Sequence, residues 1–135
     1  MTDADLAAIY LATHITVEHD GELRSLREID LDAGAMLHVI TAWNPGDERP
    51  GVHANDAADR RLHHRLVELG CIPVRAVGTD PGSDHHEPGW AVEGLTDDQA
   101  REIGAEFGQV AVFRVHDGFQ TVIACGGAWQ VSRRY

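Results

Sequence analysis

The spacing of apolar and polar positions alternates along the chain between the period of a strand and that of a helix. Residues 35–43, AMLHVITAW, are almost continuously apolar, which is typical of a strand covered on both faces. Residues 55–69 carry leucines at helical spacing and precede a glycine, so they predict a helix. Residues 96–107 predict a second helix, because a capping box opens this segment and another glycine follows it.

Shorter segments complete the predicted elements. An N-terminal helix is expected at 2–12, and strands are expected at 13–18, 71–78, 89–94, 109–116 and 119–126, with 23–29 as the hairpin partner of the first strand.

From Ala35 onward the elements follow the order β-α-β-β-α-β-β, whose first six members have the split β-α-β, or ferredoxin-like, order. The sequence therefore predicts an α+β fold, ferredoxin-like or a related two-layer sandwich, with a mainly antiparallel sheet and helices on one face. We expect a single domain over 1–135. It would comprise an N-terminal helix and strand addition at 1–34, the core at 35–125 and a tail at 126–135.

In a sheet of this order, the first two core strands end at the edge where the next two begin. Asn44 follows the first of these strands, and Glu87 comes just before the third. Gln109 opens the fourth strand, and Asn55 opens the helix that follows the first. We therefore expect these polar side chains to meet at one rim of the sheet. The other candidate binding residues at this rim are Trp43, Pro45, Arg60 and Trp90.

A helix N-terminus at this rim offers unpaired backbone N–H groups to an anionic or carbonyl group. The amides of Asn44, Asn55 and Gln109 supply donors and acceptors, and the tryptophans supply stacking faces. Each amide also has a structural alternative: Asn44 suits a turn, Asn55 suits a helix N-cap, and Gln109 can bond an orphan helix carbonyl. Glu87 is the candidate general base, unless it forms a closed ion pair with an arginine of the neighbouring helix.

The balance of charges narrows the classes of function. The chain has 22 acidic and 11 basic residues, a formal net charge of −11, and no lysine. The absence of lysine excludes a Schiff-base enzyme, a P-loop lysine and a lysine general base. The acidic surplus disfavours nucleic acid as a partner, because phosphate binding needs a basic surface. None of the few serines lies in a G-x-S-x-G motif, so the usual serine-hydrolase mechanism has no support.

The expected cellular location follows from the absence of membrane-spanning and secretory patterns in the sequence. No apolar run approaches the roughly 20 residues that cross a bilayer, and the acidic start of the chain does not fit a secretory signal. Cys71 and Cys125 are far apart and are expected to be reduced thiols. We therefore expect a cytoplasmic protein with no membrane partner, and the sequence leaves any cofactor unknown.

The stretch SDHHEPGW raises the question of a metal site. Adjacent histidines in an extended chain point in opposite directions and seldom bind one ion together. His85 and Glu87 share a side, however, and would bind zinc if His53 or His64 supplied a third ligand. A metal-dependent hydrolase is therefore one alternative function. His38, inside the apolar strand, is expected to be a satisfied core histidine.

Three short motifs, TAWNP, EPG and FGQ, follow one another within about Leu37 to Val115. They resemble the T-A-x-N-P, E-x-S and F-x-Q motifs of the bacterial family of proteins of unknown function numbered 3293. The resemblance implies functional positions at Asn44, Pro45, Asn55, Glu87 and Gln109. Gly89 stands where the family has serine, so any role of that hydroxyl is lost here. The family has no established activity, and the resemblance implies a site without a reaction.

Two further classes of function remain open. The leading hypothesis is a small domain that binds a polar or anionic, nucleotide-like small molecule at the predicted rim, with or without turnover. The second is a non-enzymatic interaction or regulatory module that forms a homodimer through residues 119–131, FQTVIACGGAWQV.

Overall fold

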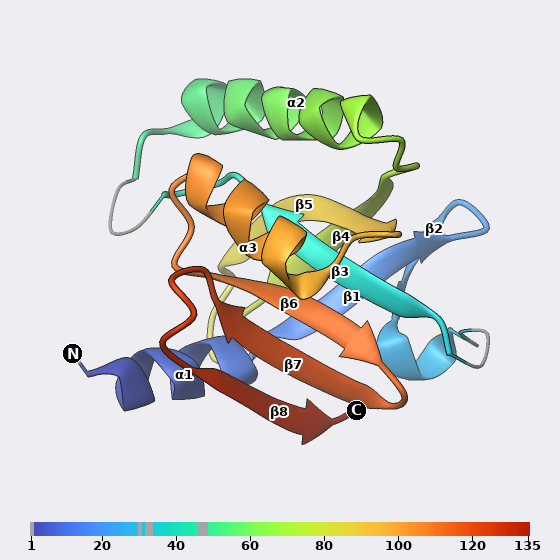
Figure 1. Ribbon diagram of the computed structural model, residues 1–135, viewed down its shortest axis with the longest axis vertical. Helices are drawn as coiled ribbons and strands as arrows, with labels where there is room; N and C mark the ends of the chain where they lie inside the picture. Colours follow the sequence, from blue (N-terminus) through green and yellow to red (C-terminus); the bar gives the residue numbers. More distant parts are fainter. Residues whose placement is uncertain (1, 30, 32–33, 46–48) are drawn as a thin grey trace.

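Three α-helices and a curled antiparallel sheet of eight strands form the part of the chain that the computed structural model describes, residues 2–29, 31, 34–45 and 49–135 (Figure 1). The elements are α1 (Asp3–Leu11), β1 (His14–His19), β2 (Glu22–Ser25), the 3-10 helix η1 (Leu26–Glu28), β3 (Met36–Thr41), α2 (Val52–Glu68), β4 (Val74–Thr79), β5 (His86–Glu93), α3 (Asp97–Glu106), β6 (Ala111–His116), β7 (Phe119–Ala124) and β8 (Gln130–Arg134). None of the described helices combines the length and the apolar character that crossing a membrane requires.

The strands lie in the order β2-β1-β4-β5-β3-β6-β7-β8, and every neighbouring pair is antiparallel. Strands β3 and β4 therefore run in one direction, and β5 and β6 run in the other. The ends of β3 and β4 lie at the edge where β5 and β6 begin. The predicted mixed α+β class with an antiparallel sheet is confirmed.

Both faces of the central strands are covered. On one face, Ile40 packs with Leu62 and Leu66 of α2 and with Ile103 of α3. On the other face, Leu37 and its neighbours pack against β1 and against Leu26, Ile29 and Leu31. This double covering explains the continuous apolar character of β3, because its successive side chains enter opposite cores.

The N-terminal segment forms a helix and a hairpin, as its pattern predicts. Thr2 begins α1 with a capping box, and Asp20 and Gly21 form the hairpin turn with φ angles of 53° and 82°. Helix α1 lies against β7 and β8, with α1 in blue and β8 in dark red in Figure 1. The Arg133 guanidinium donates to the carbonyl of Leu11 over 2.6 Å. The N-terminal segment is thus tied to the last strand of the sheet.

Several boundaries differ from the predicted ones. Helix α2 begins at Val52, three residues before Asn55, because Gly51 serves as its N-cap with a φ of 94°. Strand β5 begins earlier than predicted, since His86 pairs with Thr79 of β4. Residues 130–134, expected in a tail, form the edge strand β8. Residues 46–48 of the predicted loop after β3 lie outside the described residues.

His38 is a core histidine that contacts an acidic residue. Its side chain is completely buried, and Nε2 lies 2.8 Å from Oδ1 of Asp97, the first residue of α3. Arg114 donates to the other carboxylate oxygen of Asp97. Only one imidazole nitrogen is satisfied, because Nδ1 of His38 has no hydrogen-bond partner among the described residues. Asp97 thus joins a buried imidazole and a guanidinium at the start of a helix.

Acid should destabilise the protein in two steps. Burial lowers the pKa of His38 below its ordinary 6.5, although Asp97 favours the charged form. The unfolded chain therefore binds this proton at a higher pH than the native protein, and stability should fall as the pH drops below about 6.5. Burial opposes ionisation of Asp97, but His38 and Arg114 together lower its pKa below 3.8, so a second loss should follow at lower pH.

Urea unfolding followed by tryptophan fluorescence, from neutral pH to about pH 3, measures both steps. The variant His38→Gln should remove the first loss of stability and keep the second. A free energy of unfolding that rises as the pH falls below about 6.5 would contradict this account of His38.

Candidate functional site

The candidate site begins where the chain leaves β3. The Thr41 hydroxyl donates to the carbonyl of Pro88 on β5 over 2.8 Å and accepts the N–H of Trp43 at 3.1 Å. Asn44 follows with a φ of 47°, in the left-handed region that asparagine enters more readily than most residues. These contacts fix the direction in which the Trp43 and Asn44 backbone leaves the sheet.

Asn44, Asn55 and Glu87 are joined by side-chain hydrogen bonds. Asn55 is buried, with 4% of its surface exposed, and its Oδ1 accepts the Asn44 N–H at 3.0 Å. Its Nδ2 donates to Oδ1 of Asn44, also at 3.0 Å. The Asn44 amide then donates to Oε1 of Glu87 over 3.1 Å. Residues from the loop after β3, from α2 and from β5 therefore form one network.

The C-terminal end of α3 closes over the same loop. The Gln109 amide donates to the carbonyls of Trp43 and Phe107 over 3.1 and 3.3 Å. Gly108 has a φ of 71°, and a Cβ atom there would lie 2.7 Å from Cβ of Pro45. The bond to Phe107 is the contact with a helix-end carbonyl that the structural alternative predicts, whereas the bond to Trp43 ties Gln109 to the loop after β3. Pro45 packs against the helix end.

An open depression of about 350 Å³ lies beside this network and the N-terminus of α2. Three of its lining residues were predicted for the site, namely Trp43, Asn44 and Asn55. Because Gly51 is the N-cap, no cap side chain covers the first turn of α2, and that turn has no acidic residue. The first N–H groups of a helix have no partner within the helix. The depression therefore adjoins a helix end that favours negative charge.

Other lining residues were not predicted. They are Arg49, Gly51, Val52, Asp84 and His86. Gly51 could have been predicted, because a glycine just before a helical pattern is a common N-cap. The sequence predicted a role only for His85 in the stretch before Glu87, yet Asp84 and both adjacent histidines line the depression.

Glu87 lies behind the depression rather than in its lining. Its Oε1 also lies 3.3 Å from Nε2 of His85, which does line the depression. Among the described residues, neither Arg60 nor Arg61 forms an ion pair with Glu87. The closed arginine pair that would argue against a catalytic carboxylate is therefore absent, and the contacts of Glu87 hold Asn44 and His85 in place.

Of the proposed metal ligands, His85 and Glu87 contact each other, whereas His64 contacts Glu68. His64 lies on the exposed side of α2, where its Nε2 is 3.3 Å from Oε1 of Glu68. In the part of the chain that the structure describes, no group of three or more His, Cys, Asp or Glu side chains is placed to hold a metal ion. The metal-dependent hydrolase stays a prediction.

Trp90 lies beneath α2, where it stacks on an arginine. The Arg75 guanidinium lies 3.7 Å from the centre of the Trp90 ring and forms two hydrogen bonds to the Asp59 carboxylate, at 3.0 and 2.9 Å. The Trp90 indole donates to the Asp59 carbonyl over 3.3 Å. Trp90 therefore anchors α2 to the sheet, and neither it nor the exposed Arg60 lines the depression.

The two cysteines are free and lie outside the depression. Burial raises the pKa of the Cys71 thiol, and it raises that of Cys125 to about 11. Both thiols are therefore protonated at neutral pH, and a protonated thiol is a poor nucleophile. Recognition by amide, imidazole and backbone N–H groups is the chemistry that this region offers.

Comparison with known proteins gives one match. The family model described as "Protein of unknown function (DUF3293)" matches residues 40–112, more than half of the 135-residue chain. No curated protein and no solved structure matches the chain. The matched segment includes the loop after β3, the whole of α2, and β5, which together carry the Asn44, Asn55 and Glu87 network. The chain belongs to the DUF3293 family of proteins of unknown function.

Proposed function

We propose that the depression beside the N-terminus of α2 binds a polar, anionic small molecule with nucleotide-like chemistry. The observation that carries this proposal is the position of the Asn44, Asn55 and Glu87 network, in which Asn55 is buried, next to a helix end without a side-chain cap. A buried amide costs free energy unless its hydrogen-bonding groups have partners. The Asn55 amide is held by two hydrogen bonds to Asn44. A rigid polar wall beside a positive helix end suits an anionic ligand.

The charges around the depression support an anion. Arg49 is cationic, His85 and His86 contribute imidazole rings, and Asp84 is the acidic lining residue among those described. The N–H groups of the first turn of α2 add partial positive charge. The Asn44 and Asn55 amides provide donors and acceptors, which is the chemistry that recognises a base or sugar edge.

Glu87 has a positioning role in this proposal. It holds the Asn44 amide at 3.1 Å and lies 3.3 Å from Nε2 of His85. A carboxylate that accepts from Nε2 leaves Nδ1 of His85 to meet a ligand. Any turnover would therefore use His85 as the group nearest the ligand, with Glu87 setting its orientation.

Replacing Asn55 by alanine should lower the free energy of unfolding by about 2 kcal/mol, because it leaves the Asn44 N–H without its buried acceptor. It should also abolish stabilisation by ligand. A thermal-shift series with inorganic phosphate, pyrophosphate, AMP and ATP measures this, since a ligand specific for the native state raises the melting temperature by mass action.

The variant Glu87→Gln tests the same site with little change in volume. It should fold, retain the contact with Asn44 and reduce the ligand-induced shift in melting temperature. Glu102→Gln, on the exposed side of α3, is the matched control and should respond as the wild type does. If none of these anions stabilises the wild type, or if Asn55→Ala and Glu87→Gln both respond as fully as it does, the proposal fails.

We also infer that residues 35–125 form a ferredoxin-like core. The strand order β4-β5-β3-β6 supports this inference, because the second and third core strands are adjacent and the fourth lies beside the first. The packing of α2 and α3 against the same face of the sheet supports it as well.

A further inference from the structure

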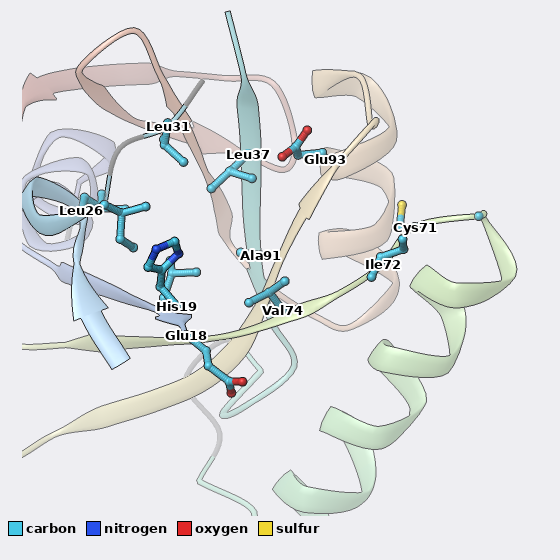
Figure 2. Close-up of a pocket in the computed structure, with 13 residues that line it drawn as sticks. Glu18, His19, Leu26, Leu31, Leu37, Cys71, Ile72, Val74, Ala91 and Glu93 are labelled. Carbon is cyan, nitrogen blue, oxygen red and sulfur yellow. The ribbon is translucent and has the colours of Figure 1, made fainter. Parts of the chain in front are cut away.

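A second cavity lies on the face of the sheet away from α2 and α3 (Figure 2). Its volume is about 520 Å³, within the range of pockets that hold small molecules. The walls come from β1, η1, Ile29, Leu31, residues 70–72, and the adjoining parts of β3, β4 and β5. It is separate from the depression at the N-terminus of α2, and the two share no lining residue.

The interior of this cavity is apolar. Leu26 and Leu37 belong to the buried cluster on this face, and Ala91 forms part of the same surface. Val74 and Ile72 extend the apolar wall outward and are 37% and 86% exposed. An apolar surface that runs from the core to solvent is suited to a hydrocarbon group, because covering it removes apolar area from water.

Two glutamates, Glu18 and Glu93, are among the described residues that line the cavity. Glu93 pairs directly with Leu37 in the β3–β5 register and projects to the same face as Ala91, two residues earlier. Figure 2 shows Glu93 beside Leu37, whereas Glu18 points away from the cavity. The charged end of a ligand would therefore meet Glu93.

No arginine lines the cavity among the described residues. The basic candidate is His19, whose Nε2 lies 3.5 Å from Oδ2 of Asp20. The whole chain carries a formal charge of −11. An anionic amphiphile such as a fatty acid would meet repulsion at this opening, and a cationic one would meet attraction.

We propose that this cavity binds an aliphatic cation, a hydrocarbon chain that ends in an ammonium group. The chain lies along Leu26, Leu37 and Val74, and the ammonium group pairs with Glu93 at the end of the wall.

Isothermal titration calorimetry tests the proposal with n-butyl-, n-hexyl- and n-octylammonium chloride, each beside the matching alcohol and carboxylate. Affinity should rise about fourfold for each added methylene until the cavity is filled. The ammonium compound should bind a few-fold more tightly than the alcohol, and the carboxylate should bind most weakly.

Two pairs of variants separate the charge from the apolar wall. Glu93→Gln should lower the affinity for the ammonium compound to that of the alcohol, and the matched variant Glu18→Gln should retain most of the preference. Val74→Thr keeps the shape of the wall but adds a hydroxyl, and should weaken binding by about fivefold or more. Val67→Thr makes the same change on the exposed surface of α2 and should have no effect.

The outcomes that overturn the proposal are distinct. Affinity that does not depend on chain length would mean that the ammonium group binds only to the acidic surface. Carboxylates that bind as tightly as ammonium compounds, or a Glu93→Gln variant that keeps the full ammonium preference, would exclude the assigned role of Glu93. Any of these results, or the absence of saturable binding, would contradict the proposal.

Discussion

Replacing Asp59 by alanine should lower the free energy of unfolding by about 3 kcal/mol, because the Arg75 guanidinium would lose its carboxylate partner beneath α2. Asp59 is 7% exposed, and its carboxylate forms both hydrogen bonds to Arg75. The Arg75 side chain is 30% exposed, so solvent screens part of the lost interaction, and the expected value lies at the lower end for a broken buried pair. Urea unfolding monitored by tryptophan fluorescence measures it.

The effect should extend to the candidate site. Arg75 also donates to the carbonyl of Gly89 over 3.2 Å and stacks on Trp90, so Asp59 ties α2 to two strands at once. Asn55 lies one helical turn before Asp59 on the same face of α2. Loosening this attachment should therefore displace the Asn55 amide from Asn44.

An exposed ion pair provides the matched control for Asp59→Ala. Asp98 is 94% exposed and pairs with Arg101 over 2.7 Å, so Asp98→Ala should cost less than about 1 kcal/mol. The double variant Asp59→Ala with Arg75→Ala should cost less than the sum of the two single variants, because the second change removes the unpaired charge. Equal losses for Asp59→Ala and Asp98→Ala would show that the buried pair does not anchor α2.

Gly89→Ser should also destabilise the protein by about 3 kcal/mol. A Cβ atom at Gly89 would lie 2.5 Å from the carbonyl oxygen of Ile40 and 3.2 Å from Cα of Thr41. Both contacts are with the backbone of β3, which cannot move aside as a flexible side chain can. The β3–β5 pair would have to separate, and Thr41 with it, so the loop that carries Trp43 should lose its fixed direction.

Gly126→Ser is the matched control, because no atom lies within 4 Å of a Cβ built there and its φ is not in the left-handed region. Gly89→Ala should cost nearly as much as Gly89→Ser, since the clash comes from Cβ rather than from the hydroxyl. Denaturant midpoints for the three variants are the measurement. If Gly89→Ser unfolds at the same urea concentration as Gly126→Ser, the close approach of β5 to β3 is not a constraint.

The elements with strong local signals could be predicted from the sequence. The capping box of Thr96 and Gln99 occurs at the start of α3 as predicted, and the apolar run of β3 is buried on both faces. These features depend on residues close together in the chain, so a pattern of neighbours is enough to specify them. Strand direction then indicated that Asn44, Asn55 and Glu87 should lie together, and hydrogen bonds join them.

The features that sequence reasoning missed depend on distant partners. Strand β8 is short and polar, and it forms because β7 offers it a free edge for pairing. Arg75 and Asp59 are 16 residues apart and on different elements, and no local pattern marks them as a pair. The apolar cavity beside Glu93 is lined by segments from β1 to β5. Its shape exists only when those segments have packed.

The sequence alone thus determined the class of fold, the two long helices, the apolar central strand and the group of amides after it, because periodicity, caps and strand direction are local or nearly local properties. Tertiary structure alone decided which polar residues line the depression. It placed Glu87 behind Asn44 and His85, put Trp90 under α2, and brought the histidine stretch to the depression. The physical reason is that a side chain's exposure and partners depend on the packing of elements far apart in the chain.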